Sequence, residues 1–450
     1  MISLQFPMRN RAYFDSIIEF APSAGWFCLM WLPLAFQYTE FHPTGRFIQF
    51  ASVTVIAIIL LLADWLCFIK AKQRTFFDDQ RSVRGFLDLV GLLFIFLVAL
   101  HLYLMPKIPL LALVVDENAT QSSLVLLRHN SAKLLDISPF VKYLFNWILV
   151  VFAPIYIVIA VFAGHWFRAI SGLFVASFYG AATLAKFPLI MLLITCLFAL
   201  SVMPTRYRRV LSLVLTAAIL IGMVLVAVFV SSSSVDFMRV RPGNVEVAAF
   251  AQMKPDDPRQ ALSYGDNLRL QSNDADLQRS TILSAAVYLL YRIWLTPVDV
   301  SNRWYQYFTY VKEKPMGFRG LIPLRDTMMV SPSREVGIWA YTARFPDKYS
   351  NTVNAYASFD ADAFARGGTL GVFIATLLLM GARIGACFLV TSSAIAFAGY
   401  GVLLCGLAIL PASASLQAIF GAQGLFLILL GLVVIRVLHN DSLKRKFGGN

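Results

Sequence analysis

The sequence predicts an all-α polytopic integral membrane protein with about ten transmembrane helices and a large helical external, periplasmic loop. Hydrophobic residues make up 58% of the chain, only 14% of residues are charged, and the mean hydropathy is +0.70, which is typical of membrane proteins rather than soluble domains. Several continuous apolar runs reach about 18 residues or more, the length that crosses a bilayer. One long segment, 231–366, is polar instead.

Ten segments have the length and composition of membrane-spanning helices. They lie at 19–37, 47–69, 86–105, 141–164, 166–183, 187–203, 210–230, 368–389, 393–411 and 416–438. The runs are continuous, whereas the strands of an outer-membrane barrel alternate in hydropathy, so a barrel is excluded.

These segments divide the chain into three parts. Residues 1–230 hold seven transmembrane helices with a short external loop at 106–140, residues 231–366 form the large loop, and residues 367–450 hold three helices and a tail. Because helices pair their backbone groups internally, they suit the hydrocarbon layer.

Lysine and arginine indicate the orientation of the chain. Basic residues cluster at 70–85, at 204–209 and at 444–446, and with ten spans these clusters fall on one side of the membrane. The positive-inside rule places that side, with both termini, in the cytoplasm of a bacterial inner membrane. The net charge of +13 is explained by these loops, so no nucleic-acid partner is expected. No cleaved signal peptide is visible at the N-terminus.

The sequence lacks the motifs of several enzyme classes. It contains no Walker loop, no G-x-S-x-G and no H-E-x-x-H, and none of its five histidines lies in 231–366. An ATP-driven pump and a His-based zinc site in the loop are therefore not expected. All five cysteines fall in apolar segments, which indicates neither a disulfide framework nor a Cys-based metal site. We expect no metal and no cofactor.

The large loop concentrates charge, with 16 Lys/Arg and 14 Asp/Glu. Within it, Thr296-Pro297-Val-Asp299 is typical of a helix start, with Thr as N-cap, Pro at N1 and Asp at N3. We interpret 282–310 as two helices that meet at Thr296 and lie at the membrane surface or partly dip into it.

Arginines in this loop are candidates for binding a multi-oxygen anion, because the guanidinium fork matches phosphate oxygens. They are Arg292, Arg303, Arg319, Arg325, Arg334, Arg344 and Arg366. Nearby aromatic side chains, including Trp304 and Tyr305, suit stacking on sugars but equally suit an interfacial aromatic belt. Asp299–Arg303 and Asp362–Arg366 have the i, i+4 spacing of simple helix pairs.

Lys186 is the one charge between the short fifth and sixth spans. It either snorkels to water or binds an anion, since an isolated charge near membrane depth is a functional candidate.

Three pieces of the sequence resemble a known family. They are Ala185-Lys186-Phe-Pro-Leu, then Tyr291-Arg292-Ile-Trp-Leu-Thr-Pro297 followed by Trp304-Tyr305-Gln-Tyr307-Phe308, and finally Asp360-Ala-Asp362-Ala-Phe-Ala-Arg366-Gly-Gly-Thr-Leu-Gly371 before a span. With the late external loop, these resemble the O-antigen polymerases, the Wzy-type oligosaccharide repeat-unit polymerases.

The resemblance implies metal-independent glycosyl transfer on the periplasmic side, in the synthesis of O-antigen or exopolysaccharide. A growing glycan on undecaprenyl pyrophosphate would move onto an incoming lipid-linked repeat unit, with a flippase and a chain-length regulator as partners. Arg or Lys would stabilise the leaving pyrophosphate, and a general base would activate the acceptor hydroxyl. Base candidates are Asp299, Asp360 and Asp362, with His129 as a further possibility. Candidates for substrate contact are Lys186, Arg292, Arg303, Arg319, Arg325, Arg344, Arg366, Trp304 and Tyr305.

Other functions fit the same architecture. An O-antigen ligase shares the polytopic body and late loop, but a functional histidine is expected in its loop. A transporter or flippase of lipid-linked sugars is expected to show repeated halves, and no repeat is visible here. A structural membrane subunit is the remaining alternative.

Overall fold

The computed structural model describes residues 18–38, 45–71, 80–105, 108, 139–183, 191, 192, 194, 195, 198, 296–312, 314–318, 333, 335, 336, 357–391 and 393–447. Within these residues the regular structure is helical throughout and contains no strand, so the prediction of a helical membrane protein is confirmed at this level. Most of the external loop 106–140, most of the predicted span 187–203, the whole of 210–230 and most of 231–366 lie outside the described residues.

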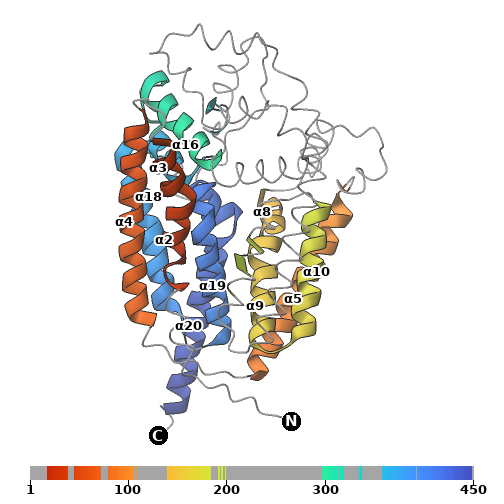
Figure 1. Ribbon diagram of the computed structural model, residues 1–450. Helices are drawn as coiled ribbons and strands as arrows, with labels where there is room; N and C mark the ends of the chain where they lie inside the picture. The colour runs from red at the N-terminus through yellow and green to blue at the C-terminus, as the bar shows by residue number, and fades with distance from the viewer. Residues whose placement is uncertain are drawn as a thin grey trace.

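The helices pack side by side into an elongated bundle (Figure 1). In chain order they are α2 (Ala21–Trp26), η2 (Phe27–Trp31), α3 (Leu32–Tyr38), α4 (Gly45–Ala71), α5 (Gln80–Leu104), α8 (Pro139–Trp147), η3 (Ile148–Phe152), α9 (Ala153–Phe162), α10 (Trp166–Ala182), α16 (Thr296–Gln306), η7 (Tyr307–Val311), α18 (Phe359–Leu389), α19 (Ala394–Ile409), η8 (Leu410–Ala412), η9 (Ala418–Ala422) and α20 (Leu425–Phe447). The η labels mark π-helical turns, except η8, which is a 3₁₀ turn.

Five helices in the described part of the chain are long and apolar enough to cross a membrane. They are Phe47–Ala71, Val83–Leu104, Tyr143–Phe162, Phe359–Leu389 and Ile395–Ala412, and Leu425–Leu438 is a shorter apolar helix. The predicted first span corresponds to the helical run α2–η2–α3, and the predicted fifth span to α10. The chain is therefore a multi-pass membrane protein.

Prolines explain two of the π-helical turns. Pro33 lies two residues after η2, and Pro154 lies two residues after η3. A proline inside a helix has no N–H to donate and its ring clashes with the carbonyl four residues earlier. A wider π-helical turn directly before the proline relieves that conflict, so the helical run continues through it.

α16 marks one end of the bundle (Figure 1). At one end, Gln49 near the start of α4 donates through Nε2 to the carbonyl of Val298 in α16, at 3.3 Å. Figure 1 shows α16 at this end, with the last residues of α4 and α20 at the opposite end. α4 and α18 both begin beside α16 and run side by side in the same direction.

A backbone kink separates the first turns of α18 from its long apolar part. Gly367 has φ −136° and ψ 15°, and Gly368 has φ 60° and ψ −150°, a conformation that only glycine adopts readily. Residues 359–366, placed in the large loop by the sequence prediction, form short helical turns that the kink joins to the span.

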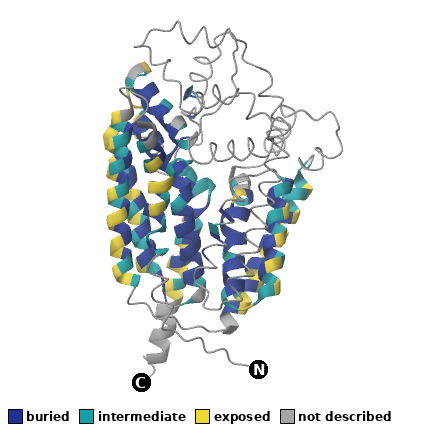
Figure 2. Cartoon of the chain, viewed as in Figure 1, coloured by how far each residue is buried: buried dark blue, intermediate teal, exposed yellow. Residues whose placement is uncertain are grey.

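The core runs through the bundle and includes buried residues of α2, α4, η3, α9, α18 and α19, while α4, α5 and α10 present apolar side chains outward (Figure 2). α19 is buried almost throughout. Its contact with α2 is close enough that a Cβ on Gly25 would lie 2.1 Å from the carbonyl oxygen of Ala408. Only glycine permits this approach.

Candidate functional site

The structure joins the two motifs that the sequence singled out. α16 covers Thr296–Gln306 and packs on the first turns of α18; the residues before Thr296 that would test the predicted helix start lie outside the described part of the chain. The hydroxyl of Tyr305 donates to Asp360 Oδ2 at 3.0 Å, and its ring lies 4.4 Å from that of Phe364 between centroids. We call Ser301, Tyr305, Ser358, Asp360, Asp362 and Arg366 the α16–α18 cluster.

Asp360 is enclosed in this cluster. Its Oδ1 accepts a short hydrogen bond from the hydroxyl of Ser358, which lies 2.6 Å from the hydroxyl of Ser301. Burial and the neighbouring Asp360 carboxylate raise the pKa of Tyr305 well above its usual value, so Tyr305 remains a donor. Asp360 has no exposed surface. The expectation that it acts as a base toward substrate is therefore corrected, because both carboxylate oxygens are occupied by protein donors.

Asp362 and Arg366 form the i, i+4 pair expected from their spacing. Arg366 Nε donates to Asp362 Oδ2 at 2.9 Å, and both side chains are nearly buried. A strap formed by 314–318 crosses the same turns: the Met316 N–H donates to the Ala365 carbonyl at 2.9 Å, and Phe318 fills the space beside Gly367. Arg366 is thus oriented by Asp362 of its own helix.

The aromatic residues of α16 are structural. Trp304 and Tyr305 are 2% and 0% exposed, so the expectation that they stack on a sugar is corrected: their rings pack inside the bundle. Arg303 of α16 is half-buried. The Asp299 backbone lies in the first turn of α16, and its side chain is outside the described set.

A partly exposed ion pair lies beside the cluster. Lys312 Nζ contacts both carboxylate oxygens of Glu335 at 2.8 and 2.9 Å, and the Tyr307 hydroxyl donates to the same carboxylate at 2.8 Å. Burial alone raises the pKa of Glu335, but the Lys312 and Tyr307 hydrogen bonds and the Lys312 charge together hold it below its ordinary value.

Five predicted substrate-contact residues lie outside the described residues: Lys186, Arg292, Arg319, Arg325 and Arg344.

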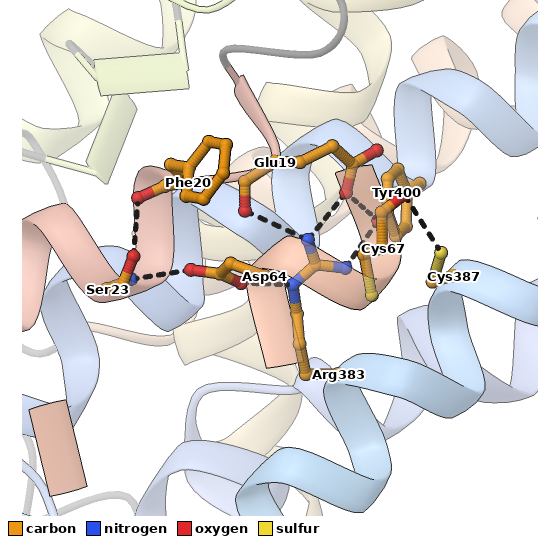
Figure 3. Close-up of polar contacts among 8 residues, drawn as sticks. All are labelled: Glu19, Phe20, Ser23, Asp64, Cys67, Arg383, Cys387 and Tyr400. Atoms are coloured by element: carbon orange, nitrogen blue, oxygen red, sulfur yellow. Dashed lines mark hydrogen bonds and ion pairs between the residues drawn. The ribbon is translucent and has the colours of Figure 1, made fainter. Parts of the chain in front are cut away.

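A second polar cluster was missed by the sequence reasoning. Arg383 of α18 donates through Nε to Asp64 Oδ1 at 3.0 Å and through Nη2 to Glu19 Oε2 at 2.5 Å (Figure 3). Tyr400 of α19 donates its hydroxyl to Glu19 Oε2 at 2.5 Å and accepts a short hydrogen bond from Arg383. We call Glu19, Asp64, Arg383 and Tyr400 the buried arginine cluster.

The buried arginine cluster lies within apolar helices. Arg383 and Asp64 have no exposed surface, and Ser23 N–H donates to Asp64 Oδ2 at 2.9 Å. Charges inside membrane spans are costly and are kept where they pair with one another. Each charge interrupts a run of apolar residues, and that interruption was the signal in the sequence that could have identified them.

No family model, no curated protein and no solved structure matches this chain. Its function is therefore argued from its own residues.

Proposed function

We propose that this protein is a polymerase of undecaprenyl-pyrophosphate-linked oligosaccharide repeat units, acting at the periplasmic face of the inner membrane. The observation that carries the proposal is the packing of Thr296–Gln306 against Asp360–Arg366 through the Tyr305–Asp360 hydrogen bond. These two segments overlap two of the three pieces that resemble the O-antigen polymerases. Their contact joins the two segments through buried polar groups at one end of an apolar bundle (Figure 1).

The orientation follows from the basic residues. Lys70 ends α4, and the last turns of α20 carry Lys444, Arg445 and Lys446. Both helix ends lie opposite α16 (Figure 1). The positive-inside rule assigns them to the cytoplasm, which directs the α16–α18 cluster to the periplasm, where a lipid-linked pyrophosphate lies at the head-group level.

The reaction has modest requirements for protein groups. The acceptor hydroxyl oxygen bonds to the anomeric carbon of the donor glycan, the bond from that carbon to the pyrophosphate oxygen breaks, and the hydroxyl proton leaves to a base. Charge accumulates on the departing undecaprenyl pyrophosphate, and fixed cations stabilise it. Arg366 is positioned by Asp362 for this role, with the partly exposed Arg303 and Lys312 at the same end.

Asp360 takes a positioning role in this proposal. Through Tyr305 and Ser358 it holds α16 against α18, so the cations of both helices keep their relative places. The proton acceptor is then a residue other than Asp360, and Asp362 and Asp299 remain candidates.

Deletion of the gene, followed by gel analysis of the surface polysaccharide, tests the proposal. Collapse of the ladder to a single repeat unit supports a polymerase, and loss of glycan from the lipid A core supports a ligase instead. An unchanged profile contradicts both. Complementation with Arg366→Ala is expected to restore insertion but not long chains. Arg168→Ala is the matched control, because Arg168 pairs with Asp88 on an exposed surface and full-length chains are expected.

One observation favours a second candidate, a transporter of lipid-linked sugars. Ionisable groups inside spans mark ion and proton pathways in transporters, and the buried arginine cluster is such a set. A transporter is identified by accumulation of lipid-linked repeat units on the cytoplasmic side in the deletion strain. A polymerase leaves them on the periplasmic side.

A further inference from the structure

Two cysteines lie one helical turn from the buried ion pair. Cys67 follows Asp64 by three residues on α4, and Cys387 follows Arg383 by four residues on α18. Residues three or four apart share a helix face, so the Asp64–Arg383 bond also brings the two thiols together. The Cys387 Sγ lies 3.9 Å from the Cys67 carbonyl oxygen (Figure 3).

Glu19 completes a group of three ligands. A carboxylate oxygen of Glu19 and the Sγ atoms of Cys67 and Cys387 all lie within 4.8 Å of one another, and all three residues are buried. They come from the start of the first helical run, from α4 and from α18. The described residues contain no other group of three that meets the same condition.

We propose that Glu19, Cys67 and Cys387 bind one thiophilic divalent cation of the zinc type. Two thiolates with one carboxylate suit such an ion. Around a tetrahedral ion with Zn–S bonds of about 2.3 Å, the two sulfurs lie about 3.8 Å apart. The three ligand atoms lie within 4.8 Å of one another, so binding the ion requires their separations to shorten by about 1 Å or less. This site is independent of the proposed polymerase activity.

The surrounding side chains prepare Glu19 as a ligand. Its Oε2 accepts from Arg383 Nη2 and from the Tyr400 hydroxyl, both at 2.5 Å. Metal-binding carboxylates are held by such outer hydrogen bonds, which orient the ligand. Arg383 itself is neutralised by Asp64 on its other edge. The guanidinium therefore fixes the carboxylate without leaving a net positive charge against the cation.

The charge balance favours a divalent ion. Two carboxylates and one guanidinium leave one net negative charge while the thiols are neutral. Binding Zn²⁺ releases one proton from each thiol, so the net charge of the site is unchanged. A monovalent ion bound by both thiolates would add one more negative charge inside the bundle, where uncompensated charge is costly.

The experiment uses purified full-length protein in lipid nanodiscs, with Cd²⁺ and Zn²⁺ as probes. Wild-type protein is expected to bind about one ion per chain, to show the thiolate-to-cadmium absorption band, and to unfold at a higher temperature with Zn²⁺. Cys67→Ser and Cys387→Ser are expected to lose the band and the stabilisation. Their affinity should fall by at least about 100-fold, and that of Tyr400→Phe by about 10-fold.

The chain supplies two matched controls. Cys28 is exposed on η2, and Cys405 is buried on α19 with its Sγ 3.9 Å from the Ile194 carbonyl. Cys28→Ser and Cys405→Ser are expected to bind the ion as wild type does. Equal binding by Cys67→Ser and wild type, or no binding by wild type, overturns the proposal.

X-ray absorption of the zinc-loaded wild type provides a second test that needs no variant to fold. Two sulfur ligands are expected, and a spectrum with oxygen and nitrogen ligands only would show that the ion binds elsewhere. The metal-site proposal is tested by ion binding and the polymerase proposal by polysaccharide chain length. A strain carrying Cys67→Ser that makes normal chains leaves the metal-site result unchanged, so either proposal can fail without the other.

Discussion

The two polar clusters of this protein hold their arginines in different ways. Arg366 pairs with Asp362 four residues earlier on the same helix, at 2.9 Å. Arg383 pairs with Asp64, 319 residues away in sequence, and with Glu19 on a third segment. The first pair forms as soon as α18 is helical, whereas the second exists only when three parts of the chain have packed. The Asp362–Arg366 pair therefore depends on local helix formation, whereas the contacts of Arg383 depend on the packing of the whole bundle.

Removing the guanidinium of Arg383 has the largest expected effect. Arg383→Ala leaves Glu19 and Asp64 buried without a counter-charge, so the free energy of unfolding should fall by about 3–5 kcal/mol. Denaturant titration in mixed micelles measures this. Arg366→Ala should cost less, because its pair is local and at the edge of the bundle. An equal fall in the free energy of unfolding for Arg383→Ala and Arg366→Ala would contradict the distinction between a long-range and a local pair.

The Gly25–Ala408 approach tests whether assembly depends on close helix packing. Gly25→Ala places a Cβ 2.1 Å from the Ala408 carbonyl oxygen, so α2 and α19 must separate and move Glu19 away from Tyr400. The expected loss of stability is about 1–3 kcal/mol, the usual range for overpacking. Gly381→Ala is the control, since a Cβ at Gly381 meets nothing within 4 Å; a loss of similar size there would contradict this explanation.

A smaller effect is expected in the α16–α18 cluster. Tyr305→Phe keeps the ring beside Phe364 but removes the donor to Asp360 Oδ2. A buried acceptor left without its donor costs about 1–3 kcal/mol, and we expect the lower part of that range because Ser358 still donates to Asp360. Thermal unfolding in nanodiscs and the length of the polysaccharide ladder are the measurements. Wild-type stability and wild-type chain lengths in Tyr305→Phe would show that the Tyr305–Asp360 hydrogen bond does not hold α16 against α18.

The Lys312–Glu335 pair should have the smallest effect. Both side chains are about a third exposed, and pairs of this kind are worth under about 1 kcal/mol. Because the folded pKa of Glu335 lies below its ordinary value, the stabilisation is present above the unfolded pKa and is lost as pH falls through the folded pKa. The difference in melting temperature between wild type and Glu335→Gln should therefore shrink toward pH 3. A difference that stays constant from pH 7 to pH 3 would contradict this.

Hydropathy, charge and helix-start chemistry were enough to predict much of the architecture. The run at 47–69 lies in a helix, and residues 296–306 are helical as expected, because length, hydropathy and helix propensity are local properties. The Asp362–Arg366 pair was predictable for the same reason. The predicted span start at 368 coincides with the Gly367-Gly368 pair, where the backbone leaves the helical conformation, but the sequence did not show that 359–366 are also helical.

The sequence by itself determined that the chain is apolar, helical and multi-pass, with its polar residues concentrated in one late segment. Only the tertiary structure decided that Trp304, Tyr305 and Asp360 are buried, since burial depends on which elements pack against α16. The tertiary structure also brings together Glu19, Asp64, Cys67, Arg383 and Cys387, which lie on three separate segments of the chain. The physical reason is that a contact across 319 residues has no periodicity along the chain and is selected by the packing of whole helices.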